Sequence, residues 1–146
     1  MKSNSKTLTV DIISSLFILL FIYAASSKLL DYQKFSIQLG KSPLLSPFSH
    51  WVVWLVPLME IGVSGLLLFK RFQYLALYAS FSLMVIFSAY IITILNFSEY
   101  IPCSCGGVLE KMSWMQHFWF NTGFIILSAG SVIIYPNKKK TTLFAK

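Results

Sequence analysis

Long apolar stretches separated by short polar segments form the main pattern of this chain. A helix that crosses the hydrocarbon core of a bilayer needs roughly 20 mostly apolar residues. Four stretches meet that length, at residues 8–30, 51–69, 72–97 and 114–135. Their apolar residues cover every side of a helix, whereas a surface helix of a soluble protein keeps a polar face. The pattern therefore predicts an all-α membrane protein in which residues 1–146 form one domain, a bundle of four transmembrane helices.

The composition and the net charge agree with a chain that is embedded in a lipid bilayer. Of the 146 residues, 56% are hydrophobic and 12% are charged, whereas soluble domains carry about 25% charged residues. The net charge of +7 does not indicate a nucleic-acid partner, because the basic residues lie at the ends of the apolar stretches. We therefore interpret these basic residues as signals of membrane topology.

The distribution of Lys and Arg predicts how the helices are oriented in the membrane, because cytoplasmic loops carry an excess of these residues. One side would hold Lys2, Lys6, Lys70, Arg71, Lys138, Lys139, Lys140 and Lys146. The other side would hold only Lys28, Lys34, Lys41 and Lys111. We therefore expect both termini in the cytoplasm, and residues 31–50 and 98–113 on the outer, periplasmic side of a bacterial inner membrane.

The first apolar stretch also has features of a secretory signal peptide. Lys2 and Lys6 precede the apolar run, and small residues follow at 23–27, as in the three regions of such a signal. The stretch is long for a signal and continues to Leu30, so we expect it to remain as a helix. Cleavage would leave three helices, with residues 98–113 still on the outer side.

Two local patterns concern the outer ends of the predicted helices. Residues 31–41 carry apolar side chains at Phe35, Ile37 and Leu39, which favours either a short helix on the membrane surface or an ordinary loop. Ser113 and Gln116 fit a capping box, in which two side chains satisfy backbone N–H groups at the start of a helix. The capping box predicts that the fourth helix begins directly after Ser113.

The only two cysteines of the chain, Cys103 and Cys105, are separated by one residue. A structural disulfide gains stability from the loop that it closes, and this pair would close almost none. The chain must bend to bring the two residues together, and strain makes a disulfide easier to reduce. Gly106 and Gly107 allow such a bend and the close approach of a partner. The spacing therefore predicts a redox-active thiol pair.

Two other interpretations of the cysteines stay open at this point. One is a chemically inert pair. The other is a metal site that would combine Cys103 and Cys105 with His117 and His50. Common zinc sites use a C-x₂₋₄-C spacing, which the C-x-C pair does not have, so we expect no metal.

A line of polar side chains follows one face of the fourth predicted helix. Trp114, His117 and Asn121 are spaced i, i+3 and i+7, which places them on the same face. Asn121 would lie about 10 Å below the start of the helix, at a rise of about 1.5 Å per residue. Such residues commonly form hydrogen bonds between membrane helices. The other interpretation is a site that binds a quinone carbonyl or transfers a proton.

Charged residues within the apolar stretches are the remaining candidates for function. Glu60 lies near the middle of the second stretch, and an ionisable residue at that depth is by default a functional-site hypothesis. Side chains tilt toward the start of their helix, so Lys28 and Glu60 should lean toward each other in antiparallel helices. A structural ion pair and a protonated Glu60 are the alternatives. We interpret Asp11 as structural, at the start of the first helix, where the helix dipole favours an anion.

Three segments give the chain a resemblance to a known family: "YAASSKLLDYQKF", "PLMEIGVSGLLL" and "CSCGGVLEKMSWMQHFWFN". They resemble the MauE/DoxX-like family of redox-associated four-helix membrane proteins over nearly the whole chain. The family often has Gly between the two cysteines and Phe after the second, where this chain has Ser104 and Gly106. These changes keep both thiols. They therefore bear on the redox potential of the cysteine pair more than on its redox role.

The resemblance implies a role in the handling of disulfides. MauE-like proteins are similar to accessory factors for the maturation of methylamine dehydrogenase, which act with a periplasmic thioredoxin-like partner. DoxX-like proteins are similar to a subunit of a thiosulfate:quinone oxidoreductase. On this resemblance Cys103 and Cys105 would be the redox pair. Lys28, Glu60, His117 and Asn121 match family positions without an assigned role.

Three functional hypotheses follow from these features. The first is a thiol–disulfide oxidoreductase or an accessory redox subunit. Because the chain has one cysteine pair, its electrons would pass directly to another protein or to a quinone near His117 and Asn121. The second is a non-enzymatic assembly factor for a periplasmic redox protein. The third is a small transporter, which Lys28 and Glu60 would suggest.

The predicted topology has a direct test in whole cells. After treatment with a membrane-impermeant reductant, a membrane-impermeant maleimide should label Cys103 and Cys105 from the outside of intact cells, because the charge distribution places residues 98–113 there. The double variant Cys103→Ser/Cys105→Ser is the control for background labelling. Labelling that requires permeabilised cells would reverse the predicted orientation.

Overall fold

The computed structural model describes residues 2–42, 45–97 and 112–135, and these are helical apart from short turns. The helices are α1 (Lys2–Leu30), α2 (Tyr32–Lys41), the 3₁₀ helix η1 (Ser46–Phe48), α3 (Ser49–Leu68), α4 (Gln73–Phe97) and α5 (Trp114–Ile134). Within the described residues, four helices are long and apolar enough to cross a membrane. The prediction of an all-α protein with four membrane-spanning helices is therefore confirmed.

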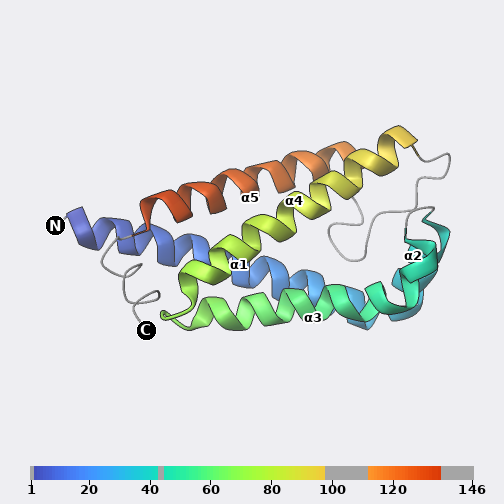
Figure 1. Ribbon diagram of the computed structural model, residues 1–146, viewed down its shortest axis with the longest axis horizontal. Coiled ribbons are helices and arrows are strands. Elements are labelled where there is room, and N and C mark those ends of the chain that lie inside the picture. Colours follow the sequence, from blue (N-terminus) through green and yellow to red (C-terminus); the bar gives the residue numbers. More distant parts are fainter. Residues whose placement is uncertain (1, 43–44, 98–111, 136–146) are drawn as a thin grey trace.

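The four long helices form an elongated bundle in which neighbours along the chain run in opposite directions (Figure 1). Helix α1 packs mainly against α3, and α4 packs mainly against α5. The short helix α2 contacts α3 and lies at one end of the bundle, whereas α1 begins and α5 ends at the opposite end (Figure 1). The α3–α4 connection spans only residues 69–72, and such a short connection makes these two helices antiparallel neighbours.

Aromatic and aliphatic side chains from all four long helices fill the centre of the bundle. Phe17 and Phe21 of α1 are fully buried, and the ring of Phe17 meets that of Phe124 edge-on, with centroids 5.1 Å apart. Large apolar side chains also cover the outside of every long helix, as Leu19, Leu55, Ile86 and Ile126 illustrate. An outer surface of this kind suits a lipid bilayer, because lipid tails are as apolar as these side chains.

The start of the first helix differs from the expectation. Helix α1 begins at Lys2, about two turns before the apolar stretch, because backbone hydrogen bonding continues beyond the residues that suit a membrane. The expectation that Asp11 begins this helix is therefore wrong, and the helix dipole does not explain it. Asp11 instead pairs with Lys70 and accepts a hydrogen bond of 2.9 Å from Gln73 Nε2. Gln73 also donates to Ser14 Oγ at 3.1 Å, so this polar cluster ties α1 to α4.

The predictions for residues 31–41 and for the capping box at Ser113 concern the α2 end of the bundle, and the structure tests both. Residues 32–41 form a helix rather than a loop, because Phe35 and Leu39 are buried and pack in one cluster with Val53 of α3. The capping box at the start of α5 is confirmed. Gln116 N donates to Ser113 Oγ at 3.2 Å, and Ser113 N donates to Gln116 Oε1 at 2.9 Å.

The polar cluster around Gln73 predicts a measurable loss of stability. Gln73→Met should lower the free energy of unfolding by about 1 kcal/mol, because it removes two interhelical hydrogen bonds of modest strength. Unfolding of the purified protein in mixed micelles, followed by circular dichroism, measures this change. The control is Ser82→Ala, because the bond of Ser82 Oγ to the Tyr78 carbonyl lies within a single helix. Equal losses of stability from the two substitutions would contradict a stabilising role for the interhelical hydrogen bonds of Gln73.

Candidate functional site

A cavity of about 240 Å³ lies at the end of the bundle where α2 is found, and residues of α1, α2, α3, α4 and α5 line it. We call it the α2-end cavity. Its walls are mostly apolar and include the rings of Phe21, Phe35, Phe87 and Phe120. Its polar lining includes Lys28, Glu60, Tyr90, His117 and Asn121. A mostly apolar cavity with a few convergent polar groups is typical of a small-molecule site.

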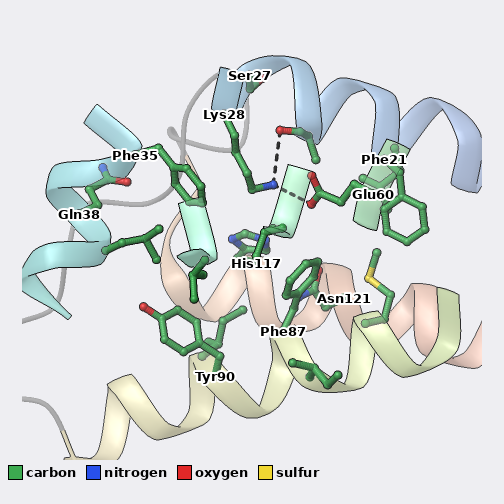
Figure 2. Close-up of a pocket in the computed structure, with 18 of the residues that line it drawn as sticks. Phe21, Ser27, Lys28, Phe35, Gln38, Glu60, Phe87, Tyr90, His117 and Asn121 are labelled. Carbon is green, nitrogen blue, oxygen red and sulfur yellow. Dashed lines mark hydrogen bonds and ion pairs between the residues drawn. The ribbon is translucent and has the colours of Figure 1, made fainter. Parts of the chain in front are cut away.

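An ion pair within the bundle forms one wall of the α2-end cavity. Lys28 Nζ lies 2.7 Å from Glu60 Oε1 and 3.4 Å from the carbonyl oxygen of Ala24. The Glu60 side chain is 1% exposed and that of Lys28 is 13% exposed. The prediction that these two side chains lean toward each other is confirmed (Figure 2), because α1 and α3 run in opposite directions and pack together (Figure 1).

The polar line of α5 forms the opposite wall of the cavity. Trp114, His117 and Asn121 all line it, so the prediction that they share one helix face is confirmed. The rings of Trp114 and His117 are nearly parallel, with centroids 6.5 Å apart. Figure 2 shows His117 and Asn121 among the residues around the same cavity as the Lys28–Glu60 pair. Residues that are 93 positions apart in sequence, Lys28 and Asn121, therefore face one space.

Three polar atoms of the cavity residues are buried without a hydrogen-bond partner among the described residues. They are Glu60 Oε2, His117 Nδ1 and Asn121 Nδ2. Asn121 is only 3% exposed, and buried polar groups are nearly always paired in folded proteins. The first two of these groups can accept a hydrogen bond and the amide donates one. The cavity thus offers complementary polar contacts to a molecule that enters it.

Several residues that line the cavity were not proposed as site residues from the sequence. Tyr90 of α4 donates a hydrogen bond of 3.1 Å to the Oγ atom of Ser42, which is fully buried after α2. Phe35 and Gln38 of α2 also line the cavity. The amphipathic pattern of residues 31–41 was the available signal, because its apolar side needs a buried surface to cover.

The predicted redox residues lie outside the described residues. Cys103, Cys105, Gly106 and Gly107 belong to the segment 98–111, so the structure does not test the interpretation of this pair. The helix ends on either side of this segment are described. The end of α4 and the start of α5 are found at the α2 end of the bundle (Figure 1).

The metal-site interpretation gains no support from the described part of the chain. His50 is not among the residues that line the α2-end cavity, and its ring lies edge-on to that of Trp51, with centroids 6.2 Å apart. Within residues 2–42, 45–97 and 112–135, no three His, Cys, Asp or Glu side chains gather as a metal site would require.

Comparison with known proteins gives one match. The sequence model of the family described as "Methylamine utilisation protein MauE" matches residues 6–134. No curated protein and no solved structure matches the chain.

The buried ion pair predicts asymmetric effects of substitution. Lys28→Met should destabilise the protein by roughly 3 kcal/mol, because it leaves the buried Glu60 carboxylate without its partner. Lys28→Met combined with Glu60→Gln should recover most of this loss, because both charges are then absent. Unfolding in mixed micelles measures both changes.

A second ion pair of the same chain supplies the control for this prediction. Lys70 pairs with Asp11 but is 60% exposed, so Lys70→Met should change the stability by less than about 1 kcal/mol. If Lys28→Met/Glu60→Gln is no more stable than Lys28→Met alone, an unpaired Glu60 carboxylate is not the cause of the lost stability.

Proposed function

The chain belongs to the MauE family of methylamine utilisation proteins, and from this premise we propose that it is a thiol–disulfide redox protein of the membrane. Its four apolar helices make it a multi-pass membrane protein. In the proposed role, Cys103 and Cys105 exchange electrons with a thioredoxin-like partner on the periplasmic side of a bacterial inner membrane. The exchange serves the maturation of redox proteins, among which the family description suggests those of methylamine utilisation.

One observation carries this proposal: the only two cysteines of the chain are one residue apart, between two membrane-spanning helices. A pair that closes almost no loop contributes little to stability, whereas strained and accessible disulfides are typically catalytic or regulatory. The α2-end cavity and its few polar groups support the proposal. The helix ends that flank the cysteine segment lie at the same end of the bundle as this cavity (Figure 1).

The chemistry is a balanced two-electron exchange. When the pair is oxidised, a thiol of the partner attacks it as a thiolate and forms a mixed disulfide. A second partner thiol then displaces the cysteine that is still bound. The partner leaves with a disulfide, and Cys103 and Cys105 hold the two electrons and two protons as a dithiol. The reverse exchange reduces a disulfide of the partner, and the two reduction potentials decide which direction prevails.

Single-cysteine variants test the proposed exchange in membranes. With an oxidised partner, Cys103→Ser or Cys105→Ser should accumulate a mixed disulfide, because the remaining thiolate attacks the partner's disulfide and has no neighbouring thiol to complete the exchange. Non-reducing electrophoresis and mass spectrometry of the purified adduct measure the capture. Treatment with a reductant should abolish the adduct.

The double variant Cys103→Ser/Cys105→Ser is the matched control, since it should capture nothing. It also separates the redox role from a purely structural role in assembly. If the redox protein that the chain helps to mature is fully mature in cells that contain only the double variant, the redox proposal is refuted. That result would favour a non-enzymatic assembly factor.

A further inference from the structure

We propose that the α2-end cavity binds the headgroup of a membrane quinone, held by Lys28 and Asn121 as donors to a carbonyl oxygen. Glu60 then accepts a hydrogen bond from a hydroxyl group when the quinone is reduced to the hydroquinone. Binding is inferred from the cavity alone. The role of the quinone as electron acceptor for Cys103 and Cys105 rests on the proposed function.

The size and the walls of the cavity suit a substituted aromatic ring. An apolar cavity of about 150 Å³ holds one benzene molecule, so about 240 Å³ accommodates a ring with small substituents. The walls include Phe35, Phe87 and Phe120, and aromatic faces and edges favour contact with another ring. The cavity is only partly enclosed, so the tail of a ligand can extend beyond it.

The polar atoms of the cavity select a ligand with oxygen atoms. Asn121 Nδ2 is a buried donor without a partner among the described residues, and it needs an acceptor such as a carbonyl oxygen. Lys28 Nζ has three protons, of which two face Glu60 Oε1 and the Ala24 carbonyl. The third proton remains for the ligand. A lipid acyl chain offers neither group a hydrogen bond, so it would leave the amide unsatisfied.

The charge of the site favours a neutral ligand over an anionic one. Lys28 and Glu60 neutralise each other at 2.7 Å, so the cavity has no surplus positive charge for a phosphate or a fatty-acid carboxylate. A quinone is neutral in its oxidised form and in its hydroquinone form. Glu60 Oε2 has no partner among the described residues and can accept the hydroxyl group that only the hydroquinone has. The same residues therefore bind both redox forms.

The electron transfer that this site would support is balanced without any further reactant. Two S–H bonds of Cys103 and Cys105 break and one S–S bond forms, which releases two electrons and two protons. The quinone takes up both electrons, and its two oxygen atoms take up both protons. His117 lines the cavity, and its imidazole can carry a proton toward the quinone because it both donates and accepts.

Binding of soluble quinone analogues to the purified full-length protein tests this inference. Decylubiquinone, a benzoquinone, and menadione, a naphthoquinone, are titrated into the protein in detergent, and binding is measured by isothermal titration calorimetry. The wild-type protein should bind at least one of them. Asn121→Leu should weaken that binding roughly tenfold, because it removes a buried donor to the ligand.

Another asparagine of the same chain supplies the matched control. Asn96 is exposed, and its side-chain amide donates to the Ile92 carbonyl of its own helix at 2.8 Å, so Asn96→Leu should leave the affinity unchanged. A photoreactive azidoquinone gives a readout on the wild-type protein that does not depend on the folding of a variant. It should crosslink to residues of α4 or α5 that line the cavity, and decylubiquinone should compete with this reaction.

The outcomes separate this inference from the proposed function. Absence of binding by both quinones, crosslinking away from the cavity, or equal binding by Asn121→Leu would overturn the inference. Mixed-disulfide capture would still support the proposed function in that case. Conversely, Cys103→Ser/Cys105→Ser should bind the quinone like the wild type. If the quinone binds but does not oxidise the cysteine pair, the binding site is supported and the role of the quinone as electron acceptor is overturned.

Discussion

The ion pair between Lys28 and Glu60 is the constraint on which this structure depends. A charge in the middle of an apolar bundle is costly unless it is paired and hydrogen-bonded. The packing of α1 against α3 therefore has to bring Lys28 and Glu60 into contact. Their contact at 2.7 Å fixes how far α1 and α3 slide along each other. That register places both residues in the wall of the α2-end cavity, opposite the polar face of α5.

The two ends of the bundle treat their polar groups differently. At the end with the α3–α4 turn, Gln73, Asp11, Ser14 and Lys70 form a bonded cluster that holds α1 against α4. The Tyr135 hydroxyl at this end is buried without a partner among the described residues, but Tyr135 does not line the α2-end cavity. At the α2 end, Glu60, His117 and Asn121 each keep one buried atom without a partner among the described residues. Polar groups that satisfy one another explain stability, whereas groups that converge on a cavity unsatisfied point to a ligand.

This contrast connects the site to the family. The chain belongs to the MauE family, and in the proposed thiol redox role its single cysteine pair passes electrons to another protein or to a quinone. The α2-end cavity is formed mainly by apolar side chains within the membrane-spanning helices. Its mostly apolar walls suit a carrier that dissolves in lipid better than a polar one.

The amino-acid sequence alone determined the features that depend on neighbouring residues. The membrane spans follow from the local length of apolar runs, the start of α5 follows from the capping box of Ser113 and Gln116, and the shared face of His117 and Asn121 follows from helical spacing. The contact of Lys28 with Glu60 followed from the antiparallel direction of two consecutive spans.

Only the tertiary structure decided what depends on contacts between distant segments. It showed that residues 32–41 form a helix, because Phe35 and Leu39 find a buried surface that includes Val53 of α3. It gave Asp11 its partners, because α4 and the turn before it return to the start of α1. It also formed the cavity, because the space between five helices depends on how side chains far apart in the sequence pack together.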